Sequence, residues 1–215
     1  MARERTGRTR AQPLADENEP EKRRAILHAA VRVFAEKGYH GCRIADVAKS
    51  AGVAYGLVYH YFRDKEELLE SVFSEQWAIF INALRAISEG PGTAPEQLAG
   101  MCRFAVDVFR TAPAAVRVLL LEVARTPNAF RAGSTKQTFE LALRIVADVV
   151  RRGVAQREVR EGADPMVVAA SLLGALEMTL TGMVVGLVGG RDEEDIEAVK
   201  EQIVALVLSG VLPRA

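Results

Sequence analysis

Residues 43–62 read RIADVAKSAGVAYGLVYHYF and form two short helical patterns on either side of Ala51-Gly52. Four apolar residues supply a small core for these helices: Ile44, Val47, Val53 and Val58. Two short helices joined by a tight turn are typical of a helix-turn-helix, whose second helix can lie in the major groove of DNA. The spacing of the apolar residues predicts an outward-facing set on the second helix: Tyr55, Tyr59 and His60. This polar and aromatic face favours a binding surface over ordinary core.

Small residues shape the same motif. We expect Ala48 and Gly52 to let the two helices approach closely around the turn. Gly56, inside the second helix, would let the backbone come near DNA because glycine has no side chain. The motif therefore predicts a compact unit with one face open to a partner.

The rest of the chain also predicts helices. Start signals, in which a capping residue is followed by an acid or a proline, occur at Asp64 with Glu67, Thr93 with Glu96, Asp164 with Pro165, and Asp192. Gly38 and Gly153 are expected at or near helix ends. The sequence shows no convincing period-two alternation and no hairpin turn between β-rich runs. We predict an all-α fold of about nine helices, with a three-helix helix-turn-helix domain at its N-terminal end.

Charge is distributed unevenly along the chain. Lys and Arg number 28, as do Asp and Glu, so the formal net charge is zero. By itself a net charge of zero argues against binding to nucleic acid, because neutralising phosphates requires basic residues. Residues 1–65, however, carry 13 basic and 8 acidic side chains, and residues 66–215 carry 15 and 20. A basic end joined to an acidic body indicates nucleic-acid or membrane contact at the basic end.

Composition also separates an N-terminal arm from the first domain. Residues 1–18 contain four arginines and almost nothing that can pack in a core. They are predicted to be a disordered basic arm, which is either simply solvated or enters a minor groove. The helix-turn-helix domain is expected to follow over residues 19–65.

Catalytic and metal sites find no support in the sequence. Cys42 and Cys102 have no metal-binding spacing and fit a reducing cytoplasm. The three histidines lack the pairing of a helical zinc site, and no Ser/His/Asp set or phosphate-binding glycine loop occurs. The N-terminus is too charged for a signal peptide. We expect a cytoplasmic protein that is not an enzyme and uses no metal or cofactor.

The segment from Met166 to Gly189 is long and apolar enough to be compared with a membrane span. It contains Glu177, and a carboxylate costs about 2.5–3.5 kcal/mol at the centre of a bilayer. We therefore expect a buried interface helix and no membrane partner. Helices over 165–188 and 192–210 could form a four-helix bundle between two subunits or the core of one subunit. Their broad apolar surface favours a homodimer through residues 165–210.

The stretch from Gly38 to Leu69, GYHGCRIADVAKSAGVAYGLVYHYFRDKEELL, resembles the DNA-binding domain of TetR-type transcriptional repressors. The matching features are Gly38-Tyr39, Ile44–Ala48, Ala51-Gly52-Val53, Gly56, Tyr59, Tyr61-Phe62, Lys65-Glu66 and Leu68-Leu69. The resemblance implies a homodimeric repressor of a palindromic operator, released by a small effector. It assigns ligand binding and dimerisation to residues 66–215. The sequence is also similar to a branch that regulates fatty-acid degradation and responds to long-chain acyl-CoA, which implies an apolar or acyl-type effector.

The resemblance also implies roles in DNA binding. Phosphate contacts fall on Tyr59 and Lys65, with Arg43 and His60 as further candidates, and base-edge contacts fall on Tyr55 and Leu57. The family usually has hydroxyl residues where Cys42, Ala54 and Leu57 stand here. The hydroxyls at the first two positions usually cap helices, and losing such a cap costs about 1 kcal/mol. We expect a more apolar readout, with Ala54 or Leu57 against thymine methyl groups.

An effector pocket is expected among the helices of the body. Its candidate lining residues are Trp77, Phe80, Phe104, Phe109, Glu122, Phe139, Glu177, Met178 and Thr181. For any single apolar member, the spacing favours ordinary core over a pocket wall. The two carboxylates stand in apolar runs, and a buried carboxylate needs a partner, either a ligand or an internal arginine such as Arg144. The alternative functions are a helical DNA-binding protein without effector control and an interaction scaffold.

Overall fold

The fold is seen in a computed structural model that describes residues 19–123 and 133–213. Within these ranges the chain is all-α and contains no strand. The elements are α1 (Glu19–Gly41), α2 (Ile44–Ala51), α3 (Tyr55–Tyr61), α4 (Lys65–Glu89), α5 (Ala94–Thr111), α6 (Pro113–Arg117), the π-helical segment η1 (Val118–Val123), α7 (Gly133–Ala155), α8 (Pro165–Val184) and α9 (Glu193–Val211). The predicted fold class is confirmed. The predicted arm, residues 1–18, lies outside the described residues.

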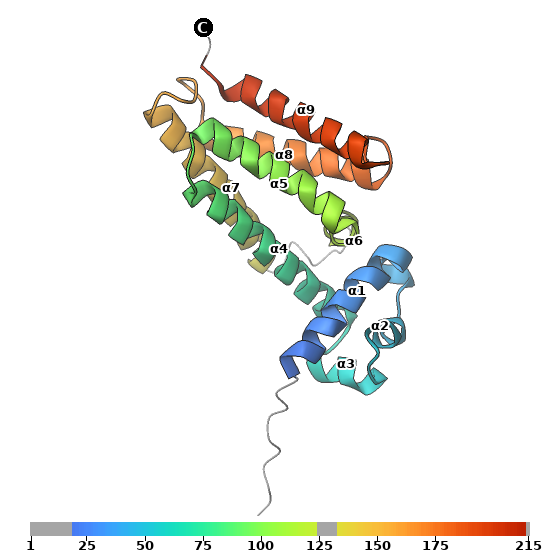
Figure 1. Ribbon diagram of the computed structural model, residues 1–215. Coiled ribbons are helices and arrows are strands. Elements are labelled where there is room, and N and C mark those ends of the chain that lie inside the picture. The colour runs from blue at the N-terminus through green and yellow to red at the C-terminus, as the bar shows by residue number, and fades with distance from the viewer. Residues whose placement is uncertain (1–18, 124–132, 214–215) are drawn as a thin grey trace, which may run out of the picture.

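Helices α1 to α3 form a small unit at one end of an elongated molecule, with α3 at the far side from α9 (Figure 1). Phe34, Val47 and Val58 are fully buried in its core. The start of α4 completes that core, because Leu68 and Phe73 belong to the same cluster of buried side chains. The core of this unit therefore extends past residue 65, the expected boundary of the domain.

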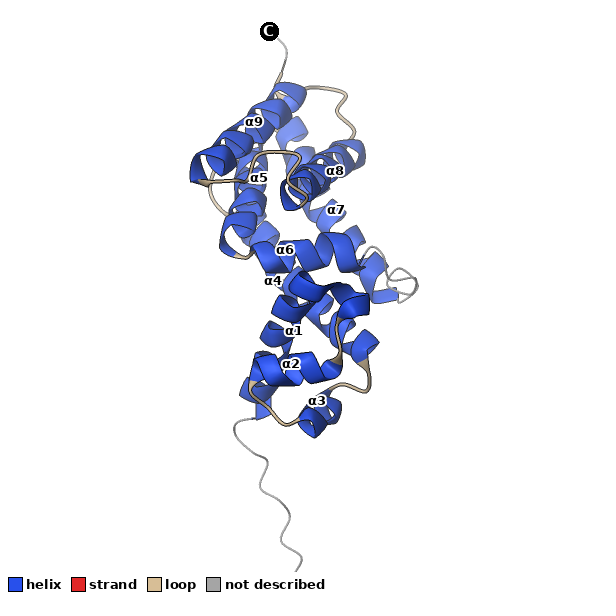
Figure 2. Ribbon diagram, turned by 90° about the vertical axis from the view of Figure 1, so that its right-hand side faces the viewer, coloured by secondary structure: helices blue, strands red, loops and turns tan. Residues whose placement is uncertain are grey.

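The remaining helices form the body of the molecule. Helix α5 packs against α9, and α7 packs against α8 (Figure 2). Helix α4 lies against α7 and runs from the small unit into the body (Figure 1). One helix therefore belongs to the cores at both ends of the molecule.

Two predicted capping boxes differ in detail. At Thr93 both bonds of the motif form: the backbone N–H of Glu96 donates to the Thr93 hydroxyl (3.4 Å), and the Thr93 N–H donates to the Glu96 carboxylate (2.7 Å). At Asp64 the first bond forms, since the Glu67 N–H donates to its carboxylate (2.8 Å). The Glu67 carboxylate accepts instead from the N–H of Arg63 (2.7 Å). Both helix starts are nevertheless held by side chains.

Gly52 acts differently from expectation, and Gly153 has a packing role besides lying near the end of its helix. Gly52 lies in the left-handed region (φ 68°, ψ 30°), and a Cβ there would meet nothing within 4 Å. The turn therefore requires the backbone freedom of glycine and not a close approach of helices. Helix α7 ends at Ala155, close to Gly153 as expected. A Cβ on Gly153 would lie 2.6 Å from the Cβ of Ala94, so this glycine permits close packing of α7 on the start of α5.

Helix α8 is the one described helix that is long and apolar enough to cross a membrane. Core helices of soluble proteins pass the same test of length and composition. One side of α8 packs inside the body through Ala169, Leu172 and Leu176. Its other side is open in the single chain, and includes Val167 and Met178, which are 63% and 71% exposed.

Candidate DNA interface and effector pocket

The outer face of α3 carries two tyrosines that hold each other in place. Tyr55 and Tyr59 are 54% and 45% exposed, while Val58 on the opposite face is fully buried. The Tyr55 hydroxyl donates to the Tyr59 hydroxyl (3.2 Å), and the two rings meet edge to face at 5.2 Å. The sequence prediction of an exposed aromatic face is confirmed in its geometry.

The first turn of α3 presents small and apolar groups. Ala54 stands at the N-cap position, is exposed and makes no capping hydrogen bond with its side chain. Leu57 is half-buried, and a Cβ added to Gly56 would meet nothing within 4 Å. The surface next to the tyrosines is therefore open and without a hydroxyl cap.

Lys65 lies between the helix-turn-helix and α4. Its ammonium donates to the carbonyl oxygens of Tyr39 (2.7 Å) and Cys42 (3.0 Å) and lies 4.5 Å from the ring centroid of Tyr39. Two of its three N–H groups thus hold the segment before α2 against the start of α4. This positioning role is not evident from the sequence.

The other candidate phosphate-binding side chains are also exposed. His60 lies 3.2 Å from the carboxylate of Glu19, measured from Nε2 to Oε1. Arg43 is exposed at the N-cap position of α2, where its backbone N–H donates to the carboxylate of Asp46 (3.0 Å). Arg43, Tyr55, Tyr59 and His60 therefore all lie on exposed parts of the helix-turn-helix.

The expected place of Cys42 at the start of α2 is wrong, because Arg43 occupies the N-cap. Cys42 precedes the cap and is buried, with its thiol donating to the carbonyl oxygen of Arg43 (3.4 Å). Burial raises the pKa of the Cys42 thiol. Burial also raises the pKa of Cys102, in the core of the body, to about 12.

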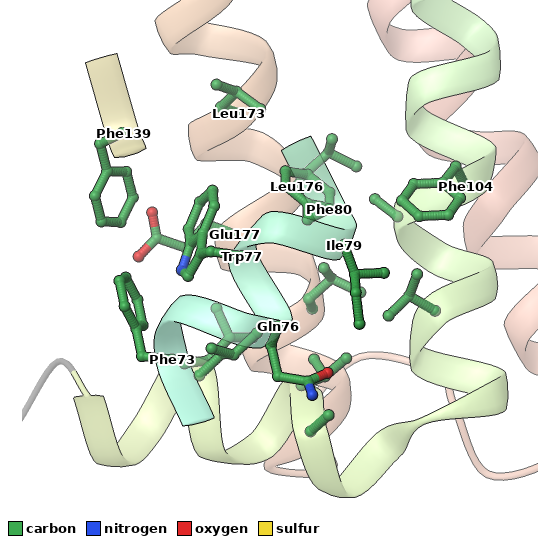
Figure 3. A pocket seen from close by; sticks show the side chains of 17 residues that line it. Phe73, Gln76, Trp77, Ile79, Phe80, Phe104, Phe139, Leu173, Leu176 and Glu177 are labelled. Carbon is green, nitrogen blue, oxygen red and sulfur yellow. The ribbon is translucent and has the colours of Figure 1, made fainter. Parts of the chain in front are cut away.

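A cavity of about 180 Å³ lies in the body beside α4. Its walls come from α4, α5, α6, η1, α7 and α8, and they are almost entirely apolar (Figure 3). Five of the predicted ligand-binding residues line it: Trp77, Phe80, Phe104, Phe139 and Glu177. Sequence reasoning missed several other lining residues, among them Phe73, Gln76, Leu119, Leu120 and Leu176. Their helical spacing predicts a face turned toward the core, but it does not indicate that a cavity lies there.

Aromatic rings form a continuous series along the pocket. Phe104 of α5 stacks on Phe80 of α4 with centroids 6.0 Å apart, and Phe80 meets Trp77 edge to face at 5.4 Å. Trp77 then contacts Phe139 at 4.8 Å and Phe73 at 5.8 Å. The series connects the middle of the body with the core of the small N-terminal unit, to which Phe73 belongs.

Other predicted pocket residues lie outside this cavity. Met178 is 71% exposed, because it projects from the open side of α8. Phe109 packs on the core of the body near Gly190, and Thr181 is not part of the lining. The side chain of Glu122 lies outside those that the structure describes.

The expectation that Glu177 is buried is also wrong. This residue is exposed, although it also lines the cavity. The suggested internal partner, Arg144, lies 3.8 Å from Glu140 on its own helix. Because α8 is apolar on nearly every side, its sequence does not indicate which side faces the core.

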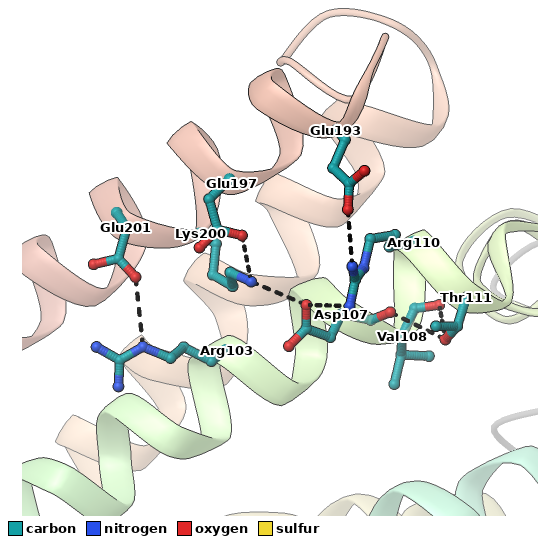
Figure 4. A network of polar contacts seen from close by, with 9 residues as sticks. All are labelled: Arg103, Asp107, Val108, Arg110, Thr111, Glu193, Glu197, Lys200 and Glu201. Carbon is teal, nitrogen blue, oxygen red and sulfur yellow. Dashed lines mark hydrogen bonds and ion pairs between the residues drawn. The ribbon is translucent and has the colours of Figure 1, made fainter.

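A polar network that the sequence did not reveal fastens α9 to α5 (Figure 4). Lys200 is 9% exposed, and its ammonium donates to the carboxylate of Asp107 (3.0 Å) and pairs with Glu197. Arg110 and Glu193 form a more exposed pair at 3.1 Å. The two pairs that join the helices, Lys200 with Asp107 and Arg110 with Glu193, are 93 and 83 residues apart in the chain, so local patterns cannot predict them.

The molecule combines a helix-turn-helix that has an exposed aromatic face with an apolar pocket in the body. This combination is typical of the class of effector-responsive DNA-binding regulators. Residues 26–72 match the family model described as bacterial regulatory proteins, tetR family. These residues therefore carry the DNA-binding domain of that family. Relatives that match most of the chain are described next.

One relative is the fatty acid metabolism regulator protein of Bacillus subtilis (strain 168), 29% identical over 186 residues, which cover 86% of this chain and 93% of the relative. The structure of the regulator FadR from Bacillus subtilis in complex with stearoyl-CoA matches with a TM-score of 0.76 at 29% identity, covering 87% of this chain and 98% of that one. The fatty acid degradation regulator FadR from Bacillus halodurans shares the fold, with a TM-score of 0.78 at 24% identity, covering 94% and 98%.

Proposed function

We propose that this protein is a homodimeric repressor that binds a palindromic operator and releases it when an acyl-type effector enters the pocket. The observation that carries the proposal is a wall shared by the pocket and the core of the DNA-binding unit. Phe73 lines the cavity and is also part of that core. Trp77 lines the cavity and packs against the cores at both ends of the molecule.

The DNA-binding surface is the exposed side of the helix-turn-helix, in a domain that begins at residue 19 and includes the start of α4. In our proposal Tyr59, Arg43, His60 and the remaining N–H of Lys65 hold phosphates, which set the position of the protein on the duplex. Base edges meet the other exposed residues of α3 and its cap: Ala54, Tyr55, Gly56 and Leu57. The fixed tyrosine pair supports this assignment, because an ordered side chain loses less entropy on binding.

The dimer is proposed to form through residues 165–210. On α8 the open side presents Val167, Ala170, Gly174 and Met178 at successive turns. On α9 Leu206 is 64% exposed. Exposed apolar surface on two adjacent helices with small residues between is typical of a helix-packing interface.

The effector is proposed to be an acyl group carried by coenzyme A. The Bacillus subtilis relative was solved with stearoyl-CoA, and the pocket of this chain is lined by aromatic and aliphatic side chains. A cavity of about 180 Å³ is only slightly larger than a 150 Å³ cavity that holds benzene. A long acyl chain must therefore displace the walls, and Phe73 and Trp77 would transmit that displacement to the DNA-binding unit.

The proposed mechanism is a shift in population between two dimer states. The two recognition helices of the dimer, one α3 from each subunit, enter successive major grooves only when they are about 34–36 Å apart. An effector that binds more tightly to a dimer with another spacing lowers operator affinity by the ratio of its affinities for the two states. The protein acts in the cytoplasm, has no enzymatic role in this proposal and needs no cofactor.

Fluorescence anisotropy with labelled DNA from upstream of the protein's own coding sequence tests the proposal. We expect specific binding that palmitoyl-CoA reverses. Leu173→Trp, which places a larger ring at the pocket wall, should keep DNA binding and lose the response, whereas Leu141→Trp on the exposed side of α7 should keep both.

The other outcomes separate the alternative functions. Specific binding that ignores palmitoyl-CoA would leave a DNA-binding protein without this effector control. Equal binding to unrelated DNA indicates a nonspecific coating role, and no binding to any DNA favours an interaction scaffold.

A further inference from the structure

Two tyrosine hydroxyls form a hydrogen-bonded pair on the outer face of α3. Tyr55 and Tyr59 lie one helical turn apart, their hydroxyl oxygens are 3.2 Å apart, and their rings meet edge to face. Both side chains are exposed, while Val58 holds the opposite side of the helix in the core. The two hydroxyls therefore lie together, as one unit, on the surface that we propose to meet DNA.

The number of protons limits what this pair can donate. A tyrosine hydroxyl donates one proton and accepts through its lone pairs. Two paired hydroxyls have two protons, and one of these lies between the two oxygens, so the pair has one proton left for a partner. That proton belongs to Tyr59 when Tyr55 donates within the pair, as in the structure. It belongs to Tyr55 when the direction is reversed.

A DNA phosphate selects one of these two directions. Phosphate oxygens are ionised and only accept, and a hydrogen bond to an ionised acceptor is about twice as strong as one between neutral groups. When Tyr59 holds a phosphate, its single proton therefore goes to the phosphate oxygen. Within the pair Tyr59 can then only accept, as it does in the structure. The Tyr55 hydroxyl is left with lone pairs alone and becomes an obligate acceptor for its next partner.

Bases differ in what they present to such an acceptor in the major groove. Adenine presents a donor at its N6 amino group and cytosine one at its N4 amino group, whereas guanine O6 and N7 and thymine O4 are acceptors. An acceptor-only hydroxyl gains a hydrogen bond from either amino group. Facing guanine or thymine, it places two acceptors against each other after both have lost their water, which costs free energy.

We propose that Tyr55 is a specificity-determining residue whose hydroxyl accepts from the amino group of an adenine or a cytosine in each half of the operator, and that Tyr59 is the positioning residue that fixes it as an acceptor. The inference rests on the proposed function, because it takes α3 as the recognition helix and Tyr59 as a phosphate contact. A phosphate contact carries no sequence information directly. Here the phosphate contact of Tyr59 sets the polarity of the neighbouring base contact.

Selection of operators from a random DNA pool by the full chain, followed by anisotropy titrations at one salt concentration, tests the role of Tyr55. Tyr55→Phe keeps the ring and removes the hydroxyl, and the base position at which it loses selectivity is the one that Tyr55 reads. There we expect the unmodified protein to prefer adenine or cytosine over guanine and thymine by about five- to hundredfold.

Base analogues without the amino group, purine for adenine and 2-pyrimidinone for cytosine, test the same contact from the DNA side. At the position that Tyr55 reads, the analogue should weaken binding by the unmodified protein and leave binding by Tyr55→Phe nearly unchanged. Placing the analogues in turn at every adenine and cytosine of the operator requires no variant, so this test holds even where a variant fails to fold.

The positioning role of Tyr59 has a separate readout. Tyr59→Phe loses the phosphate contact and frees the proton of Tyr55, so guanine and thymine become acceptable at the same base position. We expect a general loss of affinity together with a loss of the preference for an amino group. Arg43→Gln, which removes a proposed phosphate contact outside the pair, should lower the affinity for all sequences and keep that preference.

The possible contrary results are distinct. If Tyr55→Phe keeps every base preference, or if no analogue weakens binding by the unmodified protein, Tyr55 does not accept from an amino group, while the proposed repressor stands. If Tyr59→Phe behaves like Arg43→Gln, Tyr59 does not set the polarity of Tyr55. If the unmodified protein selects no DNA sequence, the inference falls together with the proposed function.

Discussion

At the residue scale, the recognition helix shows how single side chains combine local stability with binding. Tyr55 and Tyr59 are exposed yet ordered by their mutual hydrogen bond. Ala54 before them leaves the first N–H groups of α3 without a side-chain cap. Helix α3 is thus attached to the domain through Val58, its own buried side chain.

Replacing Ala54 by serine tests this account of α3. A serine at an N-cap accepts a hydrogen bond from the first turn, so Ala54→Ser should stabilise the protein by about 1 kcal/mol. Urea unfolding at neutral pH measures the change, with Ala78→Ser, at an exposed site inside α4, as the control without a gain. Equal effects of the two substitutions would contradict the assignment of Ala54 as the cap.

At the scale of elements, helix positions were predictable because their signals are local. Asp64, Thr93, Asp164 and Asp192 each cap the helix that the sequence assigned to them. The orientation of α8 was not predictable in the same way. Its residues are apolar on nearly every side of the helix axis. Only packing against the other helices therefore decides which side is buried and which side is open.

The pocket was partly predictable, because some of its residues also carry a local signal in the sequence. The aromatic residues of α4, Trp77 and Phe80, follow a helical stripe that must face other helices, and both line the cavity. Glu177 was found because a carboxylate in an apolar run is conspicuous, although its exposure was not foreseen. Met178 lies one residue further along the helix, about 100° away, and this rotation takes it to the open surface.

The attachment of α9 to α5 gives a prediction at this scale. Lys200→Met leaves the carboxylate of Asp107 without its nearly buried partner, so we expect a loss of about 1–3 kcal/mol in the free energy of unfolding. Arg103→Met breaks only an exposed pair with Glu201 and should cost less than about 1 kcal/mol. Chemical denaturation of both variants measures the difference.

The contribution of Lys200 should also depend on pH. Its hydrogen bonds to Glu197 and Asp107 raise its pKa above the ordinary value of 10.5. A raised pKa in the folded state stabilises fully below the unfolded value and is lost as the pH rises through the folded value. The stability difference between the protein and Lys200→Met should thus be constant near neutral pH and shrink above pH 10.5. A difference that shrinks on acidification near neutral pH contradicts this assignment.

At the scale of the whole molecule, the neutral total charge conceals a basic end and an acidic body. The basic end carries the exposed face of α3, and the open sides of α8 and α9 lie at the opposite end (Figure 1). This arrangement places positive charge near the operator and directs the acidic body away from it. Local charge can then attract DNA while the neutral total keeps nonspecific association weak.

The phosphate contacts imply a strong dependence on salt. A dimer that holds about 6–10 phosphates should lose about 10³–10⁵ in operator affinity between about 50 and 200 mM salt. Anisotropy titrations over this range measure the slope, with the loss expected to be similar for operator and unrelated DNA. A nearly flat dependence contradicts the roles proposed for Arg43, Tyr59 and Lys65.

The central claim is that an acyl effector changes the distance between the two DNA-binding units of the dimer. A spin label at Glu36→Cys, an exposed site on α1, reports that distance by electron–electron double resonance, because Cys42 and Cys102 are buried and shielded from labelling. We predict one narrow distance distribution on operator DNA and a different, displaced distribution with palmitoyl-CoA. Release of the operator by palmitoyl-CoA with an unchanged distribution would contradict the account.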